Sequence, residues 1–266
     1  MIARDAAFGG VIAPTAADAD AAVKAGMLAR RTARRYLGIS IPPFLIGAVT
    51  PADAATGSPA GGGCAFVFPW RFARRSPANS LPSHILPHEL GHAIFIRFVA
   101  PRTAIDQYGG AAPDWLDEMA ALAFEDDAGV RLRRADTYRH AVRGALIPLS
   151  RLLTMAHPEW DARALASGAS GSAPMVQPAS SETPAFYATV RAAFDFLIDR
   201  TGDPRVIRVL TARARTKAGL DRWLLAHAAR GGVRRSLAGL DRDIRSFVLN
   251  DPAYRAAARS GAGPRA

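Results

Sequence analysis

Apolar residues recur at helical spacing along most of this chain, and two shorter apolar runs interrupt that pattern near the N-terminus. The first helical pattern covers residues 18–37. The two apolar runs that follow predict strands. One lies within residues 39–49 and begins after Pro43, and the other covers residues 64–68 and is closed by Pro69.

The remainder of the sequence predicts helices. Ser83 is a suitable N-cap for the first of these, and Pro87 is tolerated there because it lies in the first turn. Pro148 kinks or breaks the third, and residues 163–184, rich in Ala, Ser, Gly and Pro, predict a flexible insertion. The seven predicted helices are 83–99, 114–124, 138–155, 184–200, 204–215, 220–229 and 236–248.

These patterns predict an α+β fold that is mostly helical, with a small N-terminal sheet. The chain has 266 residues, of which 49% are hydrophobic and 21% charged, so it can bury a sizeable core and is not disordered as a whole. We find no internal repeat, and we expect a single domain over residues 1–266. Residues 1–135 would form the sheet and the first helices, and residues 136–266 a helical subdomain with the insertion.

The formal net charge of +11 comes almost entirely from arginine, since only two of the 34 basic residues are lysines. Such a charge raises the possibility of nucleic-acid binding. However, the arginines are spread along the chain in short doublets, with no RNA-binding motif beside them, so nucleic acid is not the favoured partner. The single cysteine, Cys64, excludes an internal disulfide and a thiolate zinc site.

The first residues lack the basic and apolar segments of a signal peptide, and no apolar stretch is long enough to span a membrane. We therefore expect a cytoplasmic protein without a membrane span, or a secreted one if a leader has been removed. The sequence does not indicate the oligomeric state.

Residues 88–92 read His-Glu-Leu-Gly-His, an HExxH motif on a predicted helix. Two histidines four residues apart lie on the same helix face, so both imidazoles can reach one metal ion. Glu89 is offset by about 100° and can take a proton from a water bound to that metal. His88, His92 and Glu89 are therefore the first candidates for a metal site.

A third metal ligand is expected from the next helix, because no further histidine follows at close spacing. Glu118 is the candidate. Glu125 lies seven residues later, two turns along the same face, where it could accept a hydrogen bond from a ligating histidine. Three of the five glutamates in the chain thus belong to the proposed site.

This set of motifs resembles the gluzincin metallopeptidases, in particular the peptidase MA-like families related to M1 aminopeptidases. The resemblance rests on HExxH, on the Trp115-Leu-Asp-Glu118 helix and on the acid seven residues after Glu118. It implies a zincin-like fold with one zinc ion bound by His88, His92 and Glu118. It also implies that Glu89 is the general base and that Glu125 contacts a metal ligand without binding the metal itself.

The resemblance continues in the helix that begins near Phe186. There it implies that Tyr187 donates a hydrogen bond to the developing oxyanion, with Tyr138 as the competitor and Tyr108 a more distant one. Two departures limit it. The Gly-x-Met-x-Asn exopeptidase motif is missing, and Met119 stands where related chains usually have glycine.

Other residues have weaker claims. A rim or capping role is favoured for His84, while His140, His157 and His227 have no partners at ligand spacing. Trp115 is expected to pack the ligand helix or to line the substrate groove. The arginines of the predicted helix 204–215 are most simply explained as its solvent-exposed face. They would favour acidic peptide substrates if that helix bordered the substrate cleft.

We therefore expect a zinc-dependent metallopeptidase that acts on a peptide or protein substrate. Two alternatives remain open: a catalytically silent zinc-binding interaction module, and a basic nucleic-acid-binding protein.

Overall fold

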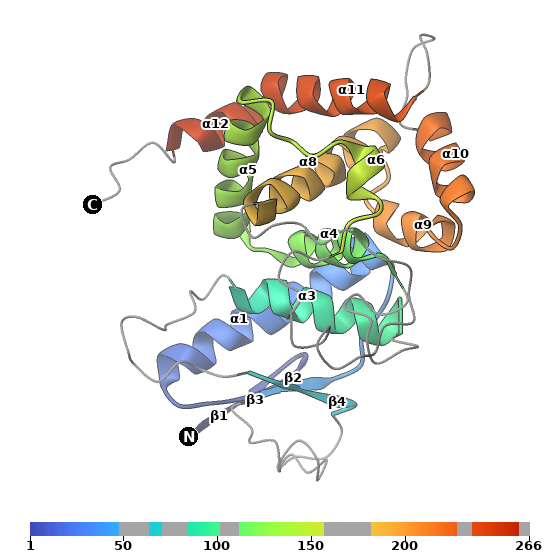
Figure 1. Cartoon of the computed structure of the whole chain (residues 1–266). Coiled ribbons are helices and arrows are strands. Elements are labelled where there is room, and N and C mark those ends of the chain that lie inside the picture. Colours follow the sequence, from blue (N-terminus) through green and yellow to red (C-terminus); the bar gives the residue numbers. More distant parts are fainter. Residues whose placement is uncertain (48–63, 71–84, 102–111, 157–181, 228–235, 261–266) are drawn as a thin grey trace, which may run out of the picture.

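A computed structural model shows an α+β fold in which helices dominate and a small sheet lies at the N-terminal end, as predicted (Figure 1). The sheet and the first helices form one layer, and the C-terminal helices pack above them. The structure describes residues 1–47, 64–70, 85–101, 112–156, 182–227 and 236–260.

The sheet has four strands in sequence order: β1 (Ile2–Ala6), β2 (Gly9–Ala13), β3 (Phe44–Gly47) and β4 (Phe66–Pro69). β1 and β2 form an antiparallel hairpin, whereas β2, β3 and β4 run parallel. The prediction of β3 and β4 is confirmed. Pro69 is compatible with β4 because this strand lies at the edge of the sheet.

The hairpin was not predicted, since residues 1–17 were assigned no structure. Gly9 has a φ of 132°, and a Cβ there would lie 2.1 Å from the carbonyl oxygen of Phe44. Only glycine fits this close approach of β2 to β3.

One long helix covers the sheet and ends where the sequence predicted. α1 (Ala16–Thr32) begins at Thr15, whose hydroxyl accepts a hydrogen bond from Asp18 N. It continues into the π-helical turn η1 (Ala33–Leu37), and Gly38 ends it with a φ of 65°.

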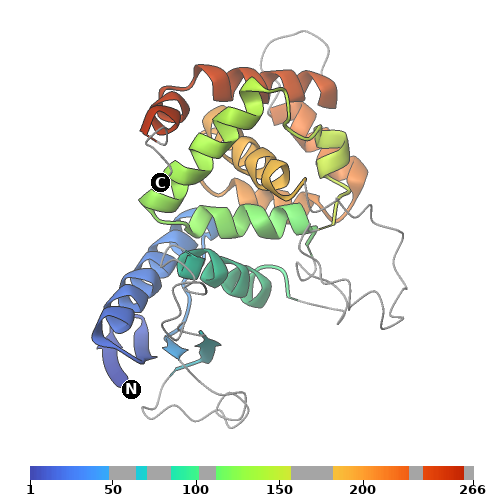
Figure 2. The same ribbon diagram turned by 60° about the vertical axis from the view of Figure 1, so that its left-hand side comes forward.

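The two helices of the predicted metal site lie against each other at close range (Figure 2). They are α3 (Ile85–Phe98) and α4 (Asp114–Phe124), and α4 has the predicted bounds. The side chain of Gly91 is a hydrogen, and a Cβ at this position would lie 2.7 Å from Ala121 Cα and 3.1 Å from Phe124 Cβ. The glycine within the HExxH motif therefore permits the close contact of α3 with α4.

The helix predicted over residues 138–155, with a kink or break at Pro148, is broken as expected, but its predicted start is wrong and the break begins earlier. α5 spans Asp127–Val142, and the short α6 spans Leu149–Leu152. The side chain of Asp126 caps α5 through Gly129 N, so the helix starts eleven residues earlier than predicted. The break comes at Gly144, with a φ of 68°, before Pro148 is reached. The start was missed because this segment is rich in arginine and lacks an apolar stripe.

The C-terminal helices agree with the predictions to within a few residues, apart from one additional helix at the end. Ser236 caps the helix over residues 237–250 through Gly239 N. The final helix, over residues 252–260, buries Tyr254 and Ala257 and was not predicted. These helices are α8 (Thr183–Thr201), α9 (Val206–Arg213), α10 (Lys217–His227), α11 (Leu237–Asn250) and α12 (Pro252–Ser260).

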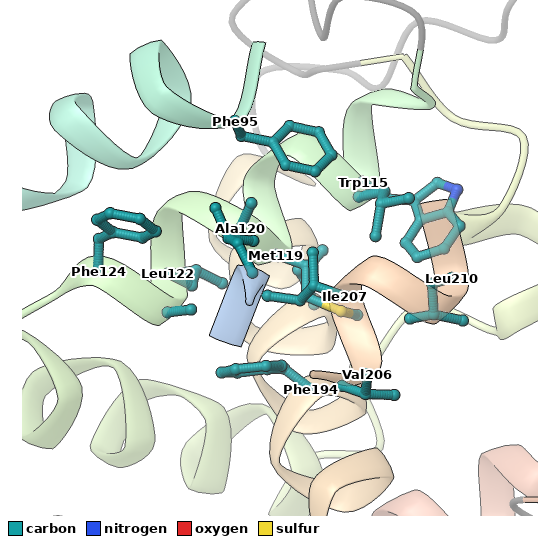
Figure 3. Close-up of a cluster of buried hydrophobic side chains, with 14 of the residues drawn as sticks. Phe95, Trp115, Met119, Ala120, Leu122, Phe124, Phe194, Val206, Ile207 and Leu210 are labelled. Atoms are coloured by element: carbon teal, nitrogen blue, oxygen red, sulfur yellow. The ribbon is translucent and has the colours of Figure 1, made fainter. Parts of the chain in front are cut away.

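Every residue of α4 is buried, so this helix occupies the centre of the molecule. Figure 3 shows its apolar side chains among those of α3, α8 and α9. Met119 is 1% exposed and lies close to Ile207. Trp115 is 2% exposed within the same hydrophobic cluster, so it packs the ligand helix.

A buried polar network joins α4 to the C-terminal helices. Asp195 accepts hydrogen bonds from Arg191, from Arg134 Nε at 2.9 Å and from the Tyr254 hydroxyl at 2.9 Å. Arg191 Nη1 also donates to the carbonyl oxygen of Leu122 on α4, at 3.3 Å. Burial opposes charge on both partners, yet the pKa of Asp195 is lowered and that of Arg191 raised, because each stabilises the other's charge.

In the described part of the chain, no helix is both long and apolar enough to cross a membrane. Ser83 and nearly all of the predicted insertion 163–184 lie outside the described residues, and the last two insertion residues begin α8.

The packing at Gly91 makes a prediction about stability. Alanine favours a helix over glycine by about 1 kcal/mol. Here, however, the added methyl group meets a backbone atom of a fully buried helix, and overpacking costs about 1–3 kcal/mol. We expect Gly91→Ala to lower the free energy of unfolding, measured by urea denaturation. An unchanged or higher value would contradict the close contact of α3 with α4.

Candidate metal centre

The ligand atoms of His88, His92 and Glu118 converge on one point between α3 and α4. The two Nε2 atoms lie 3.2 Å apart. One carboxylate oxygen of Glu118 lies 3.4 Å from His88 Nε2, and the other lies 3.5 Å from His92 Nε2. In the part of the chain that the structure describes, this trio has the geometry of a metal-binding group.

These separations are compatible with a small metal ion. Ligand atoms about 2.1 Å from a tetrahedral zinc ion lie about 3.4 Å from one another. The two Nε2 atoms are 3.2 Å apart, and one ligand atom from each of the three residues lies within 4.8 Å of the other two. Two imidazoles and a carboxylate also suit zinc and several other divalent transition metals, so the residues present can hold such an ion.

The opposite nitrogen of each histidine faces a buried carboxylate. His92 Nδ1 lies 2.8 Å from Asp117 Oδ2, and His88 Nδ1 lies 3.3 Å from Glu125 Oε1. With the Nδ1 proton directed at a carboxylate, the Nε2 lone pair of the neutral ring points at the metal position. Asp117 therefore orients His92 for metal binding through a hydrogen bond, whereas Glu125 lies close to His88 Nδ1 without forming a hydrogen bond to it.

Asp117 was not singled out by the sequence analysis, although it is fully buried and directly precedes Glu118. A buried aspartate in the first turn of an apolar helix requires a hydrogen-bond or ionic partner. This requirement could have identified Asp117 as a site residue from the sequence. The partner, His92, is 25 residues away in sequence.

Glu125 lies near His88, as expected, but it is not part of the helix that was expected to carry it. α4 ends at Phe124, and Glu125 has an extended ψ of 145°, so it does not continue the helix. Its side chain nevertheless remains near α3, where Oε1 accepts a hydrogen bond from Arg133 Nε at 2.9 Å. Arg133 belongs to α5 and was not predicted as a site residue.

Negative charge dominates the buried side of this site. Asp117 and Glu118 are 0% exposed and Glu125 is 7% exposed. The pKa of His92 is raised to about 9: burial alone lowers it, but Asp117 and the more distant Glu118 and Glu89 outweigh that effect. The site therefore stabilises positive charge, as a cation-binding site must.

A cleft of about 360 Å³ lies beside α3, and His88 is the member of the His88, His92 and Glu118 trio that lines it. Glu89 of α3 and Tyr187 of α8 also line this cleft. The ring centroids of His88 and Tyr187 lie 6.4 Å apart. Apart from Glu125, the other residues that line the cleft are Ile85, Gly129, Leu132, Arg133 and Asp136.

The other sequence candidates do not join this cleft. Tyr138 and His140 belong to α5, but neither is among the residues that line it. His227 stacks on Trp223 of α10. The arginines of 204–215 are also missing from the described lining, and Arg208 instead donates to the carbonyl oxygen at the end of η1. The candidates outside the described residues are His84, Tyr108 and His157.

Comparison of the chain with protein-family models, with curated proteins and with solved structures gives no match in any of the three.

The contact between Asp117 and His92 predicts an effect on metal affinity. Asp117→Asn removes the charge that orients and polarises the imidazole, and such partners are worth about 10–100-fold in affinity. We expect that loss of Zn²⁺ affinity in competition with a chromophoric chelator. Asp136→Asn removes an equal charge from the cleft without touching a histidine, and it serves as the control. Equal affinities for the two variants would contradict the role of Asp117.

Proposed function

We propose that this protein is a zinc-dependent metallopeptidase of the gluzincin type. The observation that carries the proposal is the convergence of His88, His92 and Glu118, of which His88 also lines a cleft together with Glu89. Two histidines and a glutamate, with one coordination position left for water or substrate, form a ligand set of catalytic zinc sites.

Zinc would be held by His88 and His92 on α3 and by Glu118 on α4. When bound, zinc supplies a Lewis acid and lowers the pKa of a bound water toward neutrality.

Glu89 is the proposed general base. It directly follows a ligand on α3, and its side chain is partly exposed in the cleft, where solvent and substrate can reach it. Its carboxylate accepts a proton from the attacking water and later donates that proton to the leaving amine. His88 and His92, in contrast, are directed at the metal position.

Tyr187 is the proposed oxyanion donor. Its ring is half-buried in the cleft lining, and one face of the ring is covered by the guanidinium of Arg133. A hydroxyl held in a partly water-excluded cleft can donate to the oxygen on which charge develops. Tyr187 thus brings a donor to the cleft from α8, whereas Glu89 comes from α3.

The cleft suits a peptide substrate. Its lining includes Leu132, which is 53% exposed, and Ile85 from the start of α3. Apolar side chains at an open cleft offer contact to substrate side chains, and polar groups such as Glu89 and Tyr187 line the same cleft.

The role of Glu89 predicts a separation of activity from metal binding. Glu89→Gln keeps the size of the side chain but removes its basicity, so peptide cleavage should fall by at least 10²-fold. Bound zinc, measured by elemental analysis, should remain stoichiometric because Glu89 is not a ligand. Glu182→Gln, on a surface ion pair with Arg151, is the control and should cleave like the parent.

The parent protein is tested against a broad peptide library with zinc quantified. A parent that binds zinc and cleaves nothing would overturn the peptidase proposal in favour of a silent zinc-binding module. A parent without zinc would overturn both.

The proposed oxyanion donor predicts a difference between two tyrosines. Tyr187→Phe removes one donor and should lower kcat by about 10²–10³-fold with little change in KM. Tyr138→Phe should have no such effect, because Tyr138 does not line the cleft. The reverse result in steady-state kinetics would assign the role to Tyr138.

A further inference from the structure

Arg133 contacts two elements of the proposed site at once. Its Nε donates to Glu125 Oε1 at 2.9 Å, and this same oxygen lies 3.3 Å from His88 Nδ1. Its guanidinium carbon lies 4.5 Å from the centroid of the Tyr187 ring. One side chain therefore reaches both the carboxylate behind a metal ligand and the proposed oxyanion donor.

These contacts remove freedom that both partners would otherwise have. Glu125 stands at the end of α4, in extended backbone, so the helix does not fix the direction of its carboxylate. The ring of Tyr187 has the His88 ring on one side, at 69° to it, and the guanidinium over its face. A planar guanidinium can hydrogen-bond a carboxylate and stack on a ring at the same time, which an ammonium cannot do.

Charge favours the same arrangement. Glu89, Glu125 and Asp136 line the described cleft, and Arg133 is the one arginine or lysine among its lining residues. Burial lowers the pKa of Arg133, but Glu125 more than reverses this effect, so the guanidinium stays charged. The guanidinium of Arg133 compensates the negative charge of Glu125. It does so through its Nε hydrogen bond to that carboxylate, and not by contact with the metal position.

We propose that Arg133 is a positioning residue that couples the metal ligand His88, through Glu125, to the proposed oxyanion donor Tyr187. The idea rests on the proposed peptidase function, but its contacts can be tested without any turnover. It assigns Arg133 no direct contact with the reacting atoms.

The test compares Arg133→Met, Arg133→Lys and a control, Arg131→Met. Arg131 is an exposed arginine on the same helix, so its variant loses the same charge from α5. Three quantities are measured: Zn²⁺ affinity by chelator competition, the visible spectrum of the Co²⁺-loaded protein, and the ¹³Cζ resonance of Tyr187. That resonance is assigned among the five tyrosines with Tyr187→Phe.

Arg133→Met should weaken Zn²⁺ binding about threefold to tenfold, less than removal of a residue in direct contact with a ligand. It should also change the Co²⁺ bands and shift the Tyr187 resonance. Arg133→Lys keeps the cation and should restore the resonance in part. Arg131→Met should match the parent in all three. An affinity, spectrum and resonance unchanged in Arg133→Met would overturn the proposal.

Peptide cleavage supplies a fourth readout. Arg133→Met should lower kcat about tenfold and leave KM within about twofold, because an oxyanion donor acts in the transition state. A rise in KM at constant kcat would instead make Arg133 a substrate-binding residue and overturn the positioning role. If the parent cleaves no peptide, the peptidase proposal fails, while the metal and tyrosine measurements still decide the role of Arg133. If Arg133→Met does not fold, Arg133→Lys against Arg131→Met decides it from the Co²⁺ bands.

Discussion

The burial of two adjacent carboxylates on α4 is the constraint on which the rest of this structure depends. Asp117 and Glu118 have no exposed surface, and an ionised carboxylate taken out of water costs several kcal/mol unless it is compensated. The histidines of α3 supply that compensation, and they can do so only because Gly91 lets the two helices approach. Helix packing and site chemistry are therefore one problem in this protein.

The C-terminal helices are organised around the same helix. They cover the apolar side of α4 (Figure 3). Arg191 of α8 donates to a carbonyl oxygen of α4 and pairs with Asp195, which in turn accepts a hydrogen bond from the Tyr254 hydroxyl. Two adjacent arginines of α5 contact different groups. Arg134 donates to Asp195 in this buried network, and Arg133 donates to Glu125 beside the cleft. The helical part thus holds α4 rigidly and also supplies one wall of the site.

The charge of the whole chain and the charge of the site have opposite signs. The net charge of +11 is carried by arginines that are spread over the sequence, and those on α9 do not line the described cleft. The site itself collects acids from a chain that contains only five glutamates. A local field made by a few buried groups therefore says more about chemistry here than the net charge does.

The sequence by itself determined those features that depend on near neighbours along the chain. A spacing of four residues places His88 and His92 on one face of α3, and apolar periodicity with terminal signals predicted α4 and most C-terminal helices. It failed where local pattern is weak: the start of α5 depends on one capping aspartate, and the hairpin β1–β2 and helix α12 bury few large side chains.

Only the tertiary structure decided how the site is completed. Glu125 faces His88 although α4 ends before it, Asp117 finds His92, and Arg133 meets Tyr187 from a different helix. Each of these contacts joins residues on separate elements, whose distance is set by helix packing. Spacing along a chain encodes which residues share a face of one helix, but not which faces of different helices meet.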